Sequence, residues 1–335
     1  MAHLVLLGTG GTIASRRTES GDSRAGDSSA ALLATVDGAA SDVTIEGRDV
    51  LSVNSFNLGF GDLRAIADAV AESLARDDVD GVVVTHGTDT LEETAAFLDA
   101  VHDDERPVVL TGAQRGADVP DTDGPRNLRD AFAVAADPSS RGRGVLAVFA
   151  GEIFAATGLR KADTVAPQPF ASITGGCIGR VLERPTYFST PQRAEPVERP
   201  GESIDDLRVD VVTAYPGADG ALLDAAVAAG ARGAVVLGTG AGNPGAALTA
   251  AIERAVAADV VVLLGSRTGS GPSLPIYGGG GAADAVAAGA LTLGEIPATQ
   301  ARVLLALALA GPGGGDAHAV GARLRERGLI TSPPA

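Results

Sequence analysis

The sequence predicts an α/β protein of two domains: a larger N-terminal domain with a mostly parallel sheet flanked by helices, and a smaller parallel α/β domain at the C-terminus. The chain has 335 residues, which corresponds to two domains at roughly 150 residues each. Short Val- and Leu-rich runs alternate with longer segments of helical period, as in parallel βαβ units. The apolar runs are nearly continuous, so we expect helices on both faces of each sheet.

The elements follow from this alternation in chain order. In the first half the expected strands are His3–Leu7, Gly81–Thr85, Pro107–Thr111 and Val145–Phe149, and the expected helices are Leu63–Ala75, Leu91–Val101 and Arg126–Ala135. In the second half the expected strands are Leu207–Val212, Gly233–Leu237 and Asp259–Leu264, and the expected helices are Ala221–Ala229, Ala246–Ala257, Thr299–Leu309 and Ala317–Gly328.

Two segments lack a hydrophobic period. Arg184–Asp206 contains four prolines and is interpreted as a linker, with a boundary near residue 200. We therefore predict an N-terminal catalytic domain over 1–185, a linker over 186–206 and a C-terminal domain over 207–335. Arg16–Ser29 is polar and has the composition of a disordered surface loop. Because it follows the carboxyl end of the first strand, we interpret 16–29 as a lid.

Composition narrows the classes of partner. The net charge is −16, aromatic residues are 3% and Trp is absent, which argues against nucleic acid and against anionic membrane surfaces. Cys177 is the single cysteine, which fits a reducing compartment. The opening residues MAHLVLLGTGG resemble a buried strand more than a signal peptide, and no apolar run reaches about 18 residues. We expect a cytoplasmic protein with a small-molecule ligand.

Hydroxyl groups and glycines follow several predicted strands. Gly8–Ser15 follows the first strand, and His86–Thr90 and Gly112–Arg115 follow two others. Ligands of parallel sheets bind at these carboxyl ends. The hydroxyls of Thr12 and Thr88 could act as nucleophiles beside glycine N–H groups and Asp89, or they could belong to helix caps, as Thr90 with Glu93 suggests.

Lys161 favours the catalytic interpretation. It is the single lysine beside 25 arginines. A lysine can lose its proton and serve as a base, whereas arginine cannot. We therefore predict a relay in which the amine lies near a Thr hydroxyl and is held by a carboxylate. The alternative is a solvated cation in a surface loop.

Other ligand classes find little support. Gly8-Thr9-Gly10 begins a dinucleotide-binding pattern, but Ile13 occupies the third glycine position. The four histidines show no ligand spacing, and Cys177 has no partner cysteine, so no metal site is predicted. His86 is interpreted mainly as a buried residue at a strand end.

Two motifs, Thr9-Gly10-Gly11-Thr12-Ile13-Ala14 and His86-Gly87-Thr88-Asp89-Thr90, resemble the signatures of bacterial-type L-asparaginases. The similarity continues through further segments along nearly the whole chain. These are Thr111–Arg115, Asp123–Leu128, Lys161 and Ala301–Leu305.

The resemblance implies hydrolysis of the side-chain amide of L-asparagine through an acyl-enzyme on Thr12, without a cofactor. It assigns Thr88, Asp89 and Lys161 to activation of a hydroxyl or water, and gives Asp89 also the substrate's α-amino group. Ser55 would hold the α-carboxylate. The implied substrate-binding set is Gly11, Ser55, Phe56, Gly87, Thr88, Asp89 and Ala113. It further implies a homotetramer of close dimers, each site completed by the partner's second domain.

Three positions depart from the family pattern. The lid has no tyrosine, since the only tyrosines are Tyr187, Tyr215 and Tyr277. Phe56 stands where many members have a glutamine. In the second domain an acidic residue is replaced by the run Tyr277–Gly281, and the nearest acid is Asp284. A different asparagine- or glutamine-like substrate, or a non-catalytic amino-acid sensor, are therefore the alternative functions.

Overall fold

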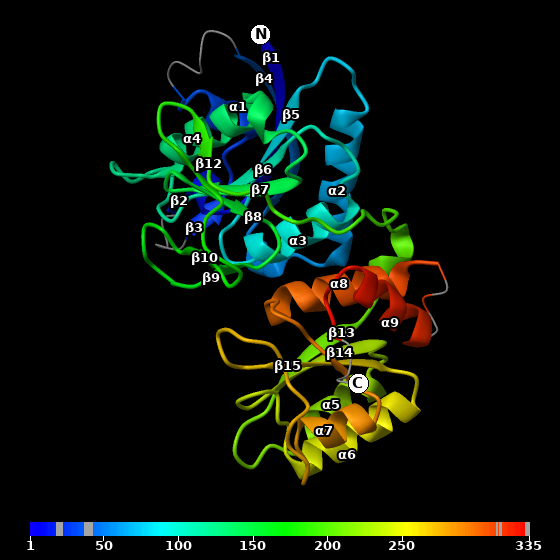
Figure 1. Cartoon of the computed structure of the whole chain (residues 1–335). Coiled ribbons are helices and arrows are strands. Elements are labelled where there is room, and N and C mark those ends of the chain that lie inside the picture. Colours follow the sequence, from blue (N-terminus) through cyan, green and yellow to red (C-terminus); the bar gives the residue numbers. More distant parts are fainter. Residues whose placement is uncertain (18–22, 37–42, 313, 315–316, 332–335) are drawn as a thin grey trace. The chain divides into compact units, whose positions relative to one another are not determined.

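The computed structural model describes residues 1–17, 23–36, 43–312, 314 and 317–331. The chain divides into two compact units, Met1–Arg199 and Pro200–Ala335. Each unit contains its own sheet and its own set of helices (Figure 1).

The first unit is built on an eight-stranded sheet. Its strands are β1 (Ala2–Gly10), β4 (Val43–Val53), β5 (Gly81–Thr85), β6 (Val108–Thr111), β7 (Val145–Phe149), β8 (Glu152–Ala155), β11 (Gly179–Val181) and β12 (Pro185–Tyr187). Their order is β12-β11-β8-β7-β6-β5-β1-β4. The five strands from β7 to β4 are parallel neighbours, and β8, β11 and β12 continue the sheet in antiparallel fashion. The predicted mostly parallel sheet is confirmed.

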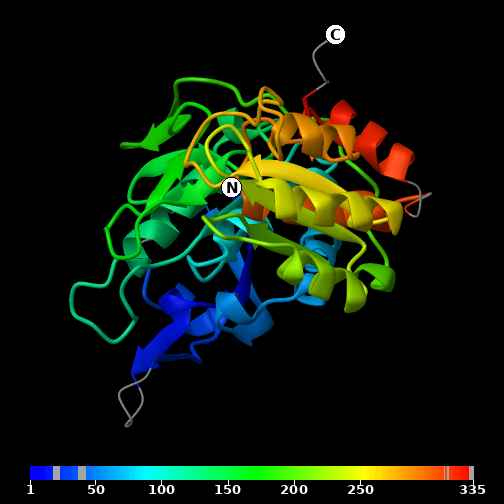
Figure 2. The ribbon, with the colours of Figure 1, turned by 90° about the horizontal axis from the view of Figure 1, so that it is seen from below.

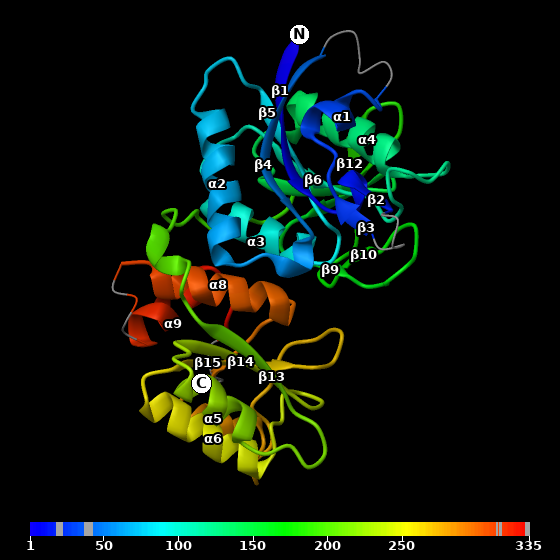
Figure 3. The same cartoon turned by 180° about the vertical axis from the view of Figure 1, so that it is seen from behind.

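Helices cover both faces of this sheet. They are α1 (Ser29–Leu33), α2 (Phe60–Leu74), α3 (Leu91–Val101) and α4 (Gly124–Ala136). Helices α1 and α4 lie on one face and α2 and α3 on the other (Figures 1 and 3). Leu4 and Leu6 of β1 pack in one apolar cluster with Leu128 and Phe132 of α4. Side chains alternate along a strand, so the intervening Val5 faces the opposite helices.

Short elements complete the first unit. Strands β2 (Ser15–Arg17) and β3 (Ser23–Ala25) form an antiparallel pair, as do β9 (Leu159–Lys161) and β10 (Phe170–Ser172). Among the described residues of this unit, three 3₁₀ helices lie in the loops: η1 (Thr12–Ala14), η2 (Ser55–Asn57) and η3 (Pro138–Ser140).

The second unit has a four-stranded parallel sheet. Its strands, β13 (Val209–Thr213), β14 (Gly233–Gly238), β15 (Val261–Ser266) and β16 (Leu291–Thr292), lie in chain order. Its helices are η4 (Glu202–Ile204), α5 (Ala221–Ala228), α6 (Ala246–Ala257), α7 (Ala282–Ala287), α8 (Ala298–Ala310) and α9 (Ala317–Glu326). Helices α5 and α6 lie side by side over one sheet face (Figure 2), where Leu223 and Ile252 share a core with Val236. The two-domain α/β class is confirmed.

Strand β4 was not predicted, and its sequence explains why. It reads VTIEGRDVLSV, in which Glu46, Arg48 and Asp49 interrupt the apolar residues. It lies at the edge of the sheet, where most of its side chains are exposed or only half-buried. The expectation that every strand is a continuous apolar run therefore fails at this edge, because only central strands are covered on both faces.

The segments expected to be irregular contain regular structure. In the expected lid, 16–29, β2 pairs with β3 in the register Arg16↔Arg24, while 18–22 lie outside the described residues. In the expected linker, β12 pairs with β11 although it starts with Pro185. A strand with proline is tolerated at a sheet edge, because the missing N–H would face outward. β12 therefore belongs to the first sheet rather than to a linker.

Candidate active site

Four loops meet at the carboxyl edge of the first sheet. They follow β4, β1, β5 and β6, which are neighbours and parallel. These loops carry Ser55, Gly11 with Thr12, the run Gly87–Asp89, and Ala113. The topology thus brings the residues singled out in the sequence to one edge, where ligands of parallel sheets bind.

Glycines allow these loops to touch. A Cβ atom on Gly11 would lie 2.3 Å from the backbone nitrogen of Gly87, and Gly11 has a φ of +80°. A Cβ atom on Gly87 would lie 2.5 Å from the Oγ atom of Ser55. Only glycine fits such an approach, and only glycine adopts that φ without strain. The loop after β5 is therefore in direct contact with the loops after β1 and β4.

Lys161 reaches this edge from β9. Its Nζ atom donates a 2.8 Å hydrogen bond to Oγ1 of Thr88 and forms a 2.7 Å ion pair with Oδ1 of Asp89. The lysine side chain is 16% exposed, so its amine is largely shielded, while the Asp89 side chain is 52% exposed. An amine, a hydroxyl and a carboxylate thus form one connected group, the Thr88–Asp89–Lys161 cluster.

Two further side chains hold this cluster and were missed in the sequence. Thr88 donates a 3.1 Å hydrogen bond to Oε1 of Gln114. The carboxylate of Glu92, which is 7% exposed, accepts a hydrogen bond from the backbone N–H of Lys161. Gln114 stands inside the motif Thr111–Arg115, and Glu92 follows the motif of Thr88. Both residues could thus be found from the motifs, but the motifs do not show which partner each side chain binds.

His86 is a buried residue at the end of β5. Burial lowers its pKa to about 4, so the ring is neutral at pH 7. Its Nδ1 atom is 2.7 Å from the carbonyl oxygen of Gly87, and its Nε2 atom is 2.8 Å from the hydroxyl of Thr94. A carbonyl only accepts, so Nδ1 carries the proton and Nε2 accepts from Thr94. His86 therefore fixes the backbone immediately before Thr88.

Thr12 begins η1 and is half-buried, with Gly11 as the residue preceding the helix. Within the described part of the chain, no hydrogen bond joins its hydroxyl to the Thr88–Asp89–Lys161 cluster. Thr90 precedes α3 but does not cap it with its side chain. Its hydroxyl donates instead to the carbonyl of Ser55, at 2.9 Å. The capping-box interpretation of Thr90 is therefore wrong: its hydroxyl is directed toward the neighbouring loop, and its oxygen accepts from no N–H group of the first turn of α3.

The other predicted binding residues differ in exposure. Ser55 is buried, with 4% of its surface exposed, and Ala113 is fully buried. Phe56, by contrast, is 63% exposed. Ala113 is buried with both its backbone and its methyl group, whereas Phe56 offers a free aromatic face.

The structure also places the tyrosines and the acid that concern the departures from the family pattern. The hydroxyl of Tyr187 pairs with Ser140 at 2.6 Å, inside the first unit. In the second unit Tyr215 and Tyr277 are exposed. The carboxylate of Asp284 accepts a 2.6 Å hydrogen bond from the N–H of Gly280, so this acid holds its own glycine loop.

The described residues show neither a metal-binding cluster nor a membrane-spanning helix. No group of three or more His, Cys, Asp or Glu side chains there is arranged to hold a metal ion. Among the described helices, none is both long and apolar enough to cross a bilayer.

Comparisons with known proteins agree with this geometry. The family model described as "Asparaginase, N-terminal" matches residues 3–193, and "Glutaminase/Asparaginase C-terminal domain" matches 208–320. The chain is 39% identical over 319 residues to a probable L-asparaginase of Deinococcus radiodurans, covering 92% of this chain and 93% of that protein. It is 33% identical over 317 residues to L-asparaginase 2 of Bacillus subtilis, covering 92% and 83%.

A solved structure is similar over almost the full length. The probable cytoplasmic L-asparaginase of Campylobacter jejuni has a TM-score of 0.85 and 26% identity, covering 96% of this chain and 98% of that one. Together with the site, these matches make the chain an amidohydrolase. It belongs to the asparaginase family, and the resemblance found in the sequence is confirmed.

Proposed function

We propose that this protein hydrolyses the side-chain amide of L-asparagine to L-aspartate and ammonia, and that its first unit carries the catalysis. The observation that carries the proposal is the position of Lys161, whose amine contacts Thr88 and Asp89 at the carboxyl edge of the sheet. The relatives named L-asparaginase support the choice of substrate.

Thr12 is the proposed nucleophile. Its Oγ1 atom attacks the amide carbon, the C–N bond breaks, and the threonine proton leaves with the nitrogen as ammonia. Water then cleaves the resulting ester, which returns the proton to Thr12 and releases aspartate. Backbone N–H groups of the glycine loops are suited to stabilise the oxyanion in each step.

The Thr88–Asp89–Lys161 cluster would move the proton. The Lys161 amine serves as the base that activates a hydroxyl or water through Thr88, a role worth ~10²–10⁴ in rate. Asp89, which is half-exposed, pairs with the amine and receives the substrate's α-amino group. Ser55 and the backbone of Gly11, Gly87 and Ala113 complete the proposed binding set, and Phe56 borders it.

The proposal extends to assembly and location. We expect a homotetramer of close dimers, to be checked by sedimentation equilibrium. We also expect a cytoplasmic protein, as the similar Campylobacter jejuni protein is named a probable cytoplasmic L-asparaginase. Cell fractionation tests this location, because a Haemophilus influenzae relative is named as periplasmic.

The test measures ammonia release from L-asparagine, D-asparagine and L-glutamine. Glutamine is included because a Pseudomonas aeruginosa relative, 32% identical over 279 residues, is named a glutaminase-asparaginase. We expect release from L-asparagine that is abolished in Thr12→Ala and partly kept in Thr12→Ser, which retains a hydroxyl. Mass spectrometry of quenched reactions should find the acyl group on Thr12. A folded protein without turnover or adduct would favour a sensor instead.

A further inference from the structure

Thr88 has a second partner besides Lys161, and that partner fixes the direction of its proton. Its hydroxyl oxygen accepts from the lysine amine at 2.8 Å, and its proton is directed to Oε1 of Gln114 at 3.1 Å. A hydroxyl has one proton, so a Thr88 that donates to Gln114 cannot donate to Lys161 at the same time. It presents only a lone pair to the amine.

The orientation of the Gln114 amide follows from its other contacts. Its Nε2 atom lies 3.1 Å from the carbonyl oxygen of Ala166 and 3.4 Å from that of Thr164. Two carbonyl oxygens require a donor, so the NH₂ group must face them and Oε1 must face Thr88. The backbone of Gln114 is fixed as well, because the carboxylate of Asp123 accepts from its N–H at 3.0 Å.

The loop that holds Gln114 belongs to the same hairpin as Lys161. Residues 162–169 join β9, which ends at Lys161, to β10. Asp163 stiffens this loop by accepting from the N–H groups of Val165 and Ala166, at 2.8 and 2.7 Å, and these bonds lower the pKa of its carboxyl. The hairpin therefore acts on Thr88 in two ways. Lys161 contacts Thr88 directly, and the carbonyl groups at the hairpin tip hold Gln114, which also contacts Thr88.

We propose that Gln114 is a positioning residue that points the Thr88 hydroxyl proton away from Lys161 and thereby favours the ammonium form of this lysine. The role rests on the proposed function, since it acts on the proposed relay. The charged groups around the amine are Asp89, in direct contact, and Glu92, which binds the backbone of Lys161. Gln114 adds no charge, so its effect comes from hydrogen-bond direction alone.

Proton transfer to Lys161 through Thr88 requires two changes. For Lys161 to take a proton through Thr88, the lysine must first be neutral and the Thr88 hydroxyl must rotate toward it. Removing the acceptor on Gln114 frees the hydroxyl to donate to the neutral amine, which makes that form easier to reach. It also releases the threonine side chain from a defined rotamer, which should slow turnover.

The test uses the fact that the chain has a single lysine. Protein labelled with ¹³C and ¹⁵N in lysine gives one side-chain NMR signal set, and its pH titration reports the charge of Lys161 directly, whether or not the enzyme turns over. The variants are Gln114→Met, which keeps length without the acceptor, and Gln114→Glu, which keeps an acceptor and adds negative charge. The matched control is Gln168→Met, since Gln168 lies in the same loop and donates instead to Phe149 and Glu152.

We expect the titration midpoint of Lys161 to move to lower pH in Gln114→Met, to higher pH in Gln114→Glu, and to stay unchanged in Gln168→Met. For L-asparagine, kcat should fall roughly tenfold in Gln114→Met, with KM changed less than about twofold. Unmoved midpoints, or shifts of the same sign in both Gln114 variants, would overturn the inference. Opposite shifts in a protein that releases no ammonia would keep this inference and reject the proposed function.

Discussion

The carboxylate of Glu92, in the first turn of α3, accepts a hydrogen bond from the backbone N–H of Lys161. This bond ties the end of β9 to the helix that follows Thr88 and Asp89. The lysine backbone is therefore fixed to the helix that directly follows the two residues its side chain contacts. A longer side chain at position 161 therefore has no room to withdraw from Thr88 and Asp89.

Lys161→Arg should lower kcat for L-asparagine by ~10² or more, about as much as Lys161→Met. Arginine keeps the charge but cannot lose its proton, and its planar head does not fit a position shaped for one nitrogen. Ammonia release and circular dichroism, measured together, separate this loss from unfolding.

The neighbouring Arg160 provides the control, because alternate residues of a strand face opposite sides. Arg160→Lys should remain active, and the double variant with both residues exchanged should be as inactive as Lys161→Arg. Activity in that exchanged variant would mean that any cation near this hairpin suffices.

Gly11→Ala should destabilise the first unit by about 3 kcal/mol and reduce activity more than tenfold. The added Cβ would lie 2.3 Å from the nitrogen of Gly87, and the φ of +80° disfavours alanine as well. The loops carrying Thr12 and Thr88 must then move apart. Urea denaturation and ammonia release measure the two effects.

Gly26→Ala is the matched control. Gly26 lies just after β3, no atom lies within 4 Å of a Cβ placed there, and its φ is not in the left-handed region. Its stability should stay within about 0.5 kcal/mol of wild type. If both variants behaved alike, the close approach of Gly11 and Gly87 would not be a constraint.

The elements that could be predicted from sequence are those buried on defined faces. Gly81–Thr85, Leu91–Val101, Val145–Phe149 and Ala246–Ala257 have the same bounds in the sequence prediction and in the structure. Each of these apolar runs has a glycine or a polar residue within two positions of either end. The strand Val43–Val53 and the short strands from β8 to β12 lack this contrast, since they lie at or near exposed edges where charged residues are tolerated.

The sequence predicts which loops form the candidate site, but it does not predict the side-chain contacts between them. Parallel topology places Thr12, Thr88 and Ala113 at one edge, and a lone lysine among arginines draws attention to Lys161. Ser55 came only from the family resemblance, because the strand before it was not predicted. The bond from Thr88 to Gln114 depends on how the loop of Thr164 and Ala166 folds back, 50 residues further along the chain. No local pattern encodes a distance of that kind. The catalytic roles themselves stay predictions until the variants are measured.

His86 should make the folded state sensitive to acid. Its pKa is about 4 in the folded protein because burial disfavours the charged ring, against about 6.5 in an unfolded chain. Between these values the unfolded state binds a proton that the folded state does not, so stability falls as pH decreases from 6.5 to 4. The loss attributable to this group is ~3 kcal/mol at pH 4.

His86→Gln removes the titrating ring and supplies the comparison. The free energy of unfolding, measured in urea at pH 7 and pH 4.5, should drop less in the variant than in wild type. His102, whose pKa burial also lowers, remains in both proteins and cancels in the difference. Equal pH dependence in the two proteins would show that His86 is not held neutral.

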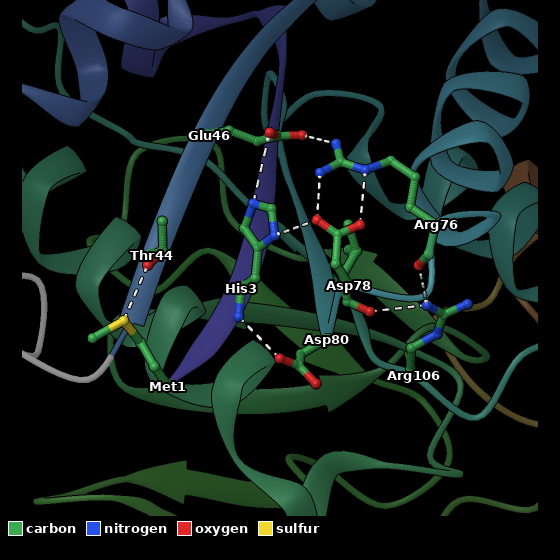
Figure 4. Close-up of polar contacts among 9 residues, drawn as sticks. Met1, His3, Thr44, Glu46, Arg76, Asp78, Asp80 and Arg106 are labelled. Carbon is green, nitrogen blue, oxygen red and sulfur yellow. Dashed lines mark hydrogen bonds and ion pairs between the residues drawn. The ribbon is translucent and has the colours of Figure 1, made fainter.

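Two arginines lie near the amino-terminal ends of the parallel strands, away from the candidate active site. They should differ sharply in their contribution to the stability of the fold. Arg76 pairs with Glu46 and Asp78, both of which also face His3 (Figure 4). The side chains of Arg76, Glu46 and Asp78 are 41–62% exposed, and ion pairs of this kind add little because water screens them. Arg76→Ala should leave the urea midpoint within error of wild type.

Arg106 forms an ion pair with Asp104 at 2.6 Å, but it also binds the backbone. Its guanidinium donates to the carbonyls of Leu74, Arg76 and Val79 where α2 ends, the last two at 2.9 Å, and it is only 17% exposed. Arg106→Ala would leave these carbonyls without their donor and should cost about 2 kcal/mol, because unsatisfied backbone groups at a helix end are expensive. Arg106→Lys should recover only part of it, since one ammonium cannot reach all three oxygens. A loss for Arg76→Ala as large as that for Arg106→Ala would mean that the exposed ion pairs, and not the bonds to the backbone, hold this edge together.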